Sequence, residues 1–122
     1  MLTLTKPALQ YAADMCGNYP FYCFGIVVKD TDDLAKCYYD LLDYVDMTQY
    51  CGNTFTQGKF NVKVYFRNGS FVELLCCEDS ARGRRWHDVV IADDVPKKLR
   101  GAVLRKYVVW SYKFDDQVNQ SE

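Results

Sequence analysis

The chain has 122 residues, a hydrophobic fraction of 49% and a formal net charge of −1. This length suits one domain with a core of its own, and this hydrophobicity excludes an intrinsically disordered chain. No apolar segment approaches the roughly 20 residues of a membrane-spanning helix, so we expect no membrane partner. We therefore expect residues 1–122 to form a single domain whose acidic end, residues 115–122, is frayed.

The first half of the chain predicts a helix, a buried strand and a second helix. Residues 7–16 place their apolar side chains on one helical face. Residues 21–28 are continuously apolar, which is typical of a strand covered on both faces in a parallel sheet. Thr31 is then predicted to cap a helix that continues to Asp46.

The second half predicts a hairpin and further strands. Alternating apolar residues in 59–66 predict a strand with one face in water, and Asn68-Gly69 predicts the turn to a returning strand over 71–77. A buried strand is expected at 88–92, a helix near Pro96 and a last strand at 108–114. These elements predict an α/β domain, a central mixed sheet with an antiparallel hairpin and flanking helices. An α+β domain with an antiparallel sheet around the hairpin is the alternative.

The cysteines are interpreted as reduced thiols. Six occur, at positions 16, 23, 37, 51, 76 and 77, without a secretory signal before them and without a C-x-x-C pair. Several lie in apolar segments, where a free cysteine behaves as a small hydrophobic residue. His87, the single histidine, adjoins Asp88, but no nucleophile motif accompanies this pair.

Three motifs follow one another in the second half: Asn-Gly-Ser at 68–70, Ala-Arg-Gly at 81–83, and an apolar strand that ends in Asp93 and Asp94. In this order and spacing they resemble the ATPase domain of the large terminase subunits of tailed phages, the motors that package viral DNA. In that family the strand ends in Asp-Glu, the Walker B motif. Residues 21–46 resemble the strand and helix that follow the phosphate-binding loop of these ATPases. The resemblance implies a fold like a truncated P-loop ATPase core.

The resemblance also implies a site. An aspartate at the end of such a strand holds Mg²⁺ through water, and the next acid activates the attacking water. These roles correspond to Asp93 and to Asp94, which stands where glutamate is usual. No G-x-x-x-x-G-K-[ST] pattern and no nuclease domain occur in these residues. We therefore expect no cofactor and no enzymatic activity of the chain alone. Mg²⁺ and ATP are expected to bind only if a partner completes the site. Alternatively, the two acids only begin the helix near Pro96.

The charged residues are distributed unevenly, with aspartates in residues 1–50 and basic residues in 59–113. The acidic candidates for a partner-binding face are Asp32, Asp33, Asp40 and Asp43. The candidates for contact with nucleic acid or a partner are Arg82, Arg84, Arg85, Trp86, Lys97 and Lys98. Arginines can grip phosphates and a tryptophan can stack on a base. A solvated loop and a solvated helix face are the alternatives.

A phage or prophage origin leads to one functional hypothesis and two alternatives. The hypothesis is a non-enzymatic protein that binds another protein in the cytoplasm of the bacterial host. An inhibitor of a host defence nuclease, of the anti-CRISPR type, is its concrete form. Either the basic residues near Arg82–Arg85 contact the target, or the acidic helix imitates DNA phosphates. The alternatives are a DNA-binding accessory, and a split or degenerate ATPase of the packaging machinery.

Overall fold

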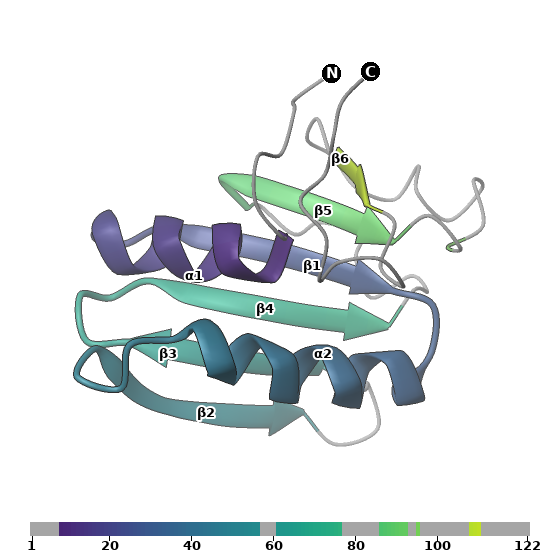
Figure 1. Ribbon diagram of the computed structural model, residues 1–122, viewed down its shortest axis with the longest axis horizontal. Coiled ribbons are helices and arrows are strands. Elements are labelled where there is room, and N and C mark those ends of the chain that lie inside the picture. The colour runs from purple at the N-terminus through teal and green to yellow at the C-terminus, as the bar shows by residue number, and fades with distance from the viewer. Residues whose placement is uncertain (1–7, 57–60, 77–85, 93–94, 96–107, 111–122) are drawn as a thin grey trace.

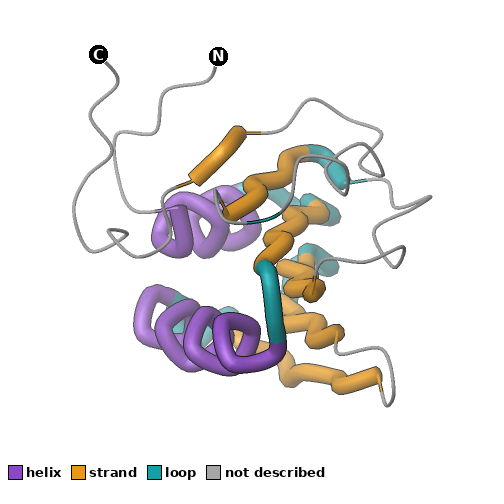
Figure 2. Tube along the Cα trace, turned by 90° about the vertical axis from the view of Figure 1, so that its right-hand side faces the viewer, coloured by secondary structure: helices purple, strands orange, loops and turns teal. Residues whose placement is uncertain are grey.

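A computed structural model describes residues 8–56, 61–76, 86–92, 95 and 108–110. They form two layers, a six-stranded sheet and two helices that lie on the same face of it (Figures 1 and 2). The elements in chain order are α1 (Ala8–Asn18), β1 (Cys23–Val28), α2 (Thr31–Tyr44), β2 (Tyr50–Thr56), β3 (Asn61–Phe66), β4 (Phe71–Cys76), β5 (Asp88–Ala92) and β6 (Val108–Trp110).

The sheet is mixed, with its strands in the order β2-β3-β4-β1-β5-β6. β1 pairs in parallel with β4 and with β5, and β5 pairs in parallel with β6. β3 pairs antiparallel with β2 and with β4. This arrangement confirms the predicted α/β fold with a hairpin in a mixed sheet, and it excludes the antiparallel α+β alternative.

β1 is covered on both faces, as its continuous apolarity predicts. Side chains alternate along a strand, so Phe24, Ile26 and Val28 point to one face and Gly25 and Val27 to the other. All five residues are buried. The first face meets the helices, because the ring of Phe24 packs edge-on against Tyr11 of α1, with centroids 5.7 Å apart.

The predicted hairpin of β3 and β4 is present, and its turn contains Gly69 at a φ of 89°, a conformation that favours glycine. One detail of the prediction holds only in part. The face of β3 expected in water is partly covered, since Asn61 is buried while Lys63 and Tyr65 are half-buried. Glu73 on β4 is buried on that face.

β2 was not among the predicted strands, because its residues, YCGNTFT, show no sustained alternation of apolar and polar residues. Pairing with β3 stabilises it, with a register shift between Tyr50 and Gly52. Contacts from two tyrosines add to this pairing. The Tyr50 hydroxyl donates a hydrogen bond to Asn53 Oδ1 at 2.5 Å, and the Tyr38 hydroxyl of α2 donates to the same atom at 3.2 Å.

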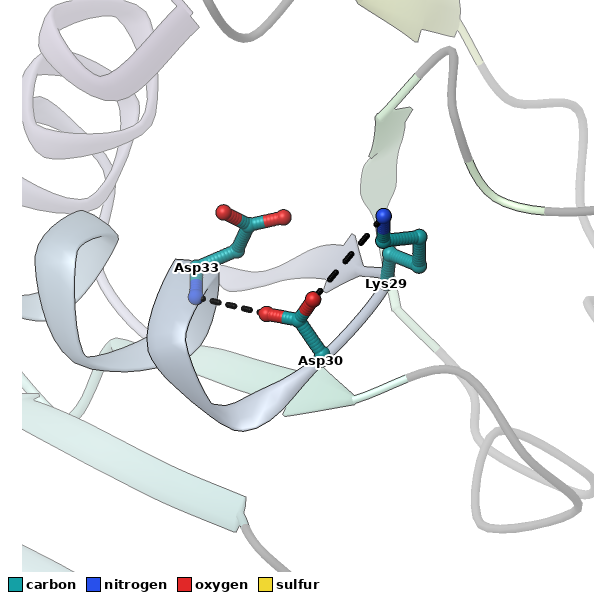
Figure 3. A network of polar contacts seen from close by, with 3 residues as sticks. All are labelled: Lys29, Asp30 and Asp33. Carbon is teal, nitrogen blue, oxygen red and sulfur yellow. Dashed lines mark hydrogen bonds and ion pairs between the residues drawn. The ribbon is translucent and has the colours of Figure 1, made fainter.

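The cap of α2 is Asp30 rather than Thr31. Asp30 has an extended backbone, and its carboxylate accepts a hydrogen bond from the Asp33 backbone N–H at 2.9 Å (Figure 3). Lys29 Nζ lies 3.9 Å from the other carboxylate oxygen of Asp30. α2 ends at Tyr44, two residues before the predicted end, because Val45 turns to an extended conformation.

Some predictions fall outside the described residues: the helix near Pro96, Cys77 and the tail 115–122. The five cysteines within the described part of the chain carry free thiols. Among the same residues, no helix is both long enough and apolar enough to cross a membrane.

Candidate functional site

α2 packs its apolar side on the sheet and presents an acidic side to solvent. Leu34 and Leu41 are buried against the sheet layer. Asp32, Tyr39 and Asp43 lie on the opposite side of the helix at spacings of seven and four residues, and all three are exposed. The Tyr39 side chain is 67% exposed, which is unusual for a large aromatic residue.

The four predicted acids are brought together on this helix. Asp32 and Asp43 are exposed, whereas Asp33 and Asp40 are half-buried at its flanks. Lys36 is the single basic residue of α2. We call Asp32, Tyr39, Asp40 and Asp43 the α2 face. Tyr39 was not among the predicted site residues, although its position opposite the apolar stripe of the helix indicates exposure.

Helix stability explains the positions of only some of the aspartates in α2. Asp32 and Asp33 lie in the first turn, where the positive end of the helix dipole favours them. Asp43 lies in the last turn, which contains no basic residue, and a negative charge there costs about 0.3–1 kcal/mol. Asp40 precedes Asp43 by three residues, so the two like charges also destabilise the helix. Asp40 and Asp43 therefore need an explanation other than helix stability.

The residues that directly follow α2 also include an acid and an exposed side chain, Asp46 and Met47. The Thr48 hydroxyl and the Thr48 backbone N–H both donate to Asp46 Oδ1, at 2.8 and 2.9 Å. These hydrogen bonds lower the pKa of Asp46 below the usual value for an aspartate. Met47 next to it is 55% exposed.

β5 is the strand that precedes the Walker B-like acids. It lies between β1 and β6 and runs parallel to both, with Val89–Ala92 buried. Asp93 and Asp94 themselves lie outside the described residues. No group of three or more potential metal ligands occurs among the side chains that the structure describes.

The basic candidates Arg82, Arg84, Arg85, Lys97 and Lys98 also lie outside the described residues. Trp86 is described, and it contradicts its predicted role. It is 2% exposed, and its indole N–H donates to Glu73 Oε1 at 3.1 Å. The ring is therefore part of the core and is not available to stack on a base.

Trp86 packs on β1 through Gly25. A Cβ atom at Gly25 would lie 2.3 Å from Trp86 Cδ2, so a glycine is required beneath the indole ring. Glu73 is 2% exposed and accepts a second hydrogen bond from Asn61 Nδ2, at 2.5 Å. Because a buried carboxylate is costly without partners, we interpret this network as structural.

The Asn-Gly-Ser turn also has a structural use that the sequence did not indicate. Ser70 is fully buried; its hydroxyl donates to the Tyr19 carbonyl at 2.6 Å and accepts the Tyr22 backbone N–H at 2.8 Å. Asn68 Nδ2 donates to the Cys16 carbonyl at 2.9 Å. The turn thus fixes the loop that joins α1 to β1.

The thiols near this loop are poor nucleophiles. Burial raises the pKa of Cys16 far above the usual range for a thiol, and burial also raises the pKa of Cys23. The Asp88 carboxylate accepts a hydrogen bond from the Tyr22 hydroxyl. The geometry therefore does not support a Cys–His catalytic pair at His87.

No protein-family model, no curated protein and no solved structure matches this chain.

Proposed function

We propose that this chain is a non-enzymatic binding protein of phage or prophage origin, which contacts another protein through the α2 face. The observation that carries the proposal is the exposed Tyr39, which lies beside two acids, Asp40 and Asp43, that do not stabilise their own helix. Tyrosine is enriched at protein interfaces, and an exposed ring flanked by charges is a suitable anchor.

The charge of the α2 face selects a basic partner. Asp32, Asp40 and Asp43 make no ion pair within the described part of the chain, so their charges are available to a partner. Nucleases that hold DNA present basic grooves, and an acidic helix can occupy the place of the phosphates. An inhibitor of a host defence nuclease, of the anti-CRISPR type, is the form of this function that we favour.

The test is capture from a lysate of phage-infected bacteria, followed by titration of the purified captured protein. The triple variant Tyr39→Ala, Asp40→Asn, Asp43→Asn should bind it about 100-fold more weakly, by loss of an anchor and of steering charges. Its stability should not fall, because both Asn substitutions remove unfavourable helix charges.

Phe21→Gly is the matched control, because it removes an equally exposed aromatic ring away from α2. Its affinity for the captured protein should equal that of the wild type. A triple variant that binds as tightly as the wild type would contradict the proposal, as would capture of packaging proteins alone.

A split or degenerate packaging ATPase is the second candidate, and the position of β5 favours it. A buried parallel strand between β1 and β6 suits the Walker B role that the terminase resemblance implies for residues 89–94. The missing phosphate-binding loop would then come from another polypeptide.

This candidate predicts that a fluorescent ATP analogue binds, with Mg²⁺, only to a mixture of this chain and a co-purified phage protein. Asp93→Asn should abolish that binding, because the metal loses its acidic ligand. Asp88→Asn, at the opposite end of the same strand, is the matched control. Binding of the analogue to the partner alone, or unchanged binding by Asp93→Asn, would rule the candidate out.

A further inference from the structure

Aromatic side chains gather where the α1–β1 loop meets the beginnings of β1 and β5. The rings of Tyr19 and Tyr22 have centroids 6.0 Å apart, and the rings of Tyr22 and His87 stack at 4.8 Å with 21° between their planes. The two outer rings, Tyr19 and His87, are exposed. Phe21 lies in the same loop and is 74% exposed. We call Tyr19, Phe21, Tyr22 and His87 the aromatic cluster.

The backbone beneath the aromatic cluster is fixed by hydrogen bonds. Besides the two bonds of the Ser70 hydroxyl, Asn68 Nδ2 donates to the Tyr19 carbonyl at 3.3 Å. The Phe21 backbone N–H donates to the Asn68 carbonyl, also at 3.3 Å. Exposed rings on a fixed backbone lose little conformational entropy when a ligand packs on them.

Phe21 combines a strained backbone conformation with an exposed ring, and neither feature stabilises the fold. Its φ is 57°, in the left-handed region, where a bulky side chain is strained. Its ring covers Gly69, where an added Cβ would lie 2.5 Å from the ring. A glycine at position 21 would relieve the strain, and the exposed ring gains little burial in return. Strain without such a gain is typical of a functional position.

The polar groups around the aromatic cluster favour an electron-rich ligand. The Cys23 backbone N–H donates to His87 Nδ1 at 3.0 Å, so the neutral ring carries its hydrogen on Nε2, as a donor. Arg67, next to Asn68, is exposed. The nearby acid, Asp88, has its carboxylate engaged by the Tyr22 hydroxyl. Planar rings, a ring N–H and a guanidinium together suit bases joined by phosphates.

We propose that the aromatic cluster binds unpaired bases of single-stranded nucleic acid. Tyr19, Phe21 and His87 offer ring faces to bases, and Arg67 offers a contact to a phosphate. Bases in a duplex are stacked on one another, so the cluster discriminates against double strands. This activity goes beyond the proposed protein contact and uses none of the residues of the α2 face.

Fluorescence anisotropy with labelled oligothymidine, and with a duplex of equal length, tests the proposal. The wild-type chain should bind the single strand at low salt and the duplex much more weakly. Phe21→Gly and His87→Ala should each weaken single-strand binding by about tenfold or more, since one stacked base is lost. Because few phosphates are contacted, added salt should weaken binding less than it weakens a basic DNA-binding surface.

Phe21→Gly is informative because it should not unfold the protein: thermal unfolding should occur at the wild-type temperature or above it. Tyr39→Ala, on α2, is the matched control and should bind the oligonucleotide like the wild type. Absence of wild-type binding at low salt, a preference for duplex, or equal binding by Phe21→Gly would each overturn the proposal. None of these outcomes affects capture of a protein by the α2 face.

Discussion

Replacing Trp86 by alanine is expected to lower the free energy of unfolding by about 3–5 kcal/mol. The indole ring is buried directly on Gly25 of β1, so its removal leaves a cavity on the central strand of the sheet. It also leaves Glu73 without the hydrogen bond that the indole N–H donates. Urea titration followed by circular dichroism measures this difference.

Trp86→Phe separates the two contributions. Phenylalanine retains most of the apolar contact with β1 but donates no hydrogen bond to Glu73, so we expect a loss of about 1–3 kcal/mol. A cost below about 1 kcal/mol for Trp86→Ala would contradict the burial of the indole ring against Gly25. It would instead support the exposed position of Trp86 that was predicted from the sequence.

The central part of the fold was predictable because its sequence pattern is local. β1 is a continuous apolar run, and the hairpin of β3 and β4 combines alternation with an Asn-Gly turn. The acids of the α2 face were predictable for the same reason, since a helical period of 3.6 residues assigns each position to a side.

Trp86 could not be placed from the sequence, because its neighbours along the chain are polar and its partners are distant. It follows two arginines and precedes His87, a context typical of a surface loop. Its burial depends on Gly25 of β1 and Glu73 of β4, which are far from it in the sequence. β2 was missed for a related reason, since its pairing with β3, rather than its own composition, makes it a strand.

The aromatic cluster was missed because it depends on tertiary structure. Tyr19 and Tyr22 are near in sequence, but His87 reaches them only because β5 pairs with β1. The Asn-Gly-Ser turn was predicted as a turn and as part of a family motif. Its hydrogen bonds to the α1–β1 loop add a role that no local pattern indicates.

Glu73→Ala is expected to destabilise the protein by about 3–5 kcal/mol, although it removes a buried carboxyl group. The substitution leaves a cavity and removes the acceptor of two hydrogen bonds, one from the Trp86 indole N–H and one from the Asn61 amide. Glu73→Gln retains one acceptor oxygen and nearly the same volume, so its expected cost is about 1–2 kcal/mol. Urea titrations of both variants give these values.

A double-mutant cycle of Glu73→Gln with Trp86→Phe then measures the interaction between the two side chains. We expect a coupling free energy of about 1–2 kcal/mol, since the residues share one buried hydrogen bond. Additive costs would show that the indole N–H and the carboxylate do not depend on each other. A variant Glu73→Gln as unstable as Glu73→Ala would mean that the charge itself, rather than the number of acceptors, is what this face of the sheet requires.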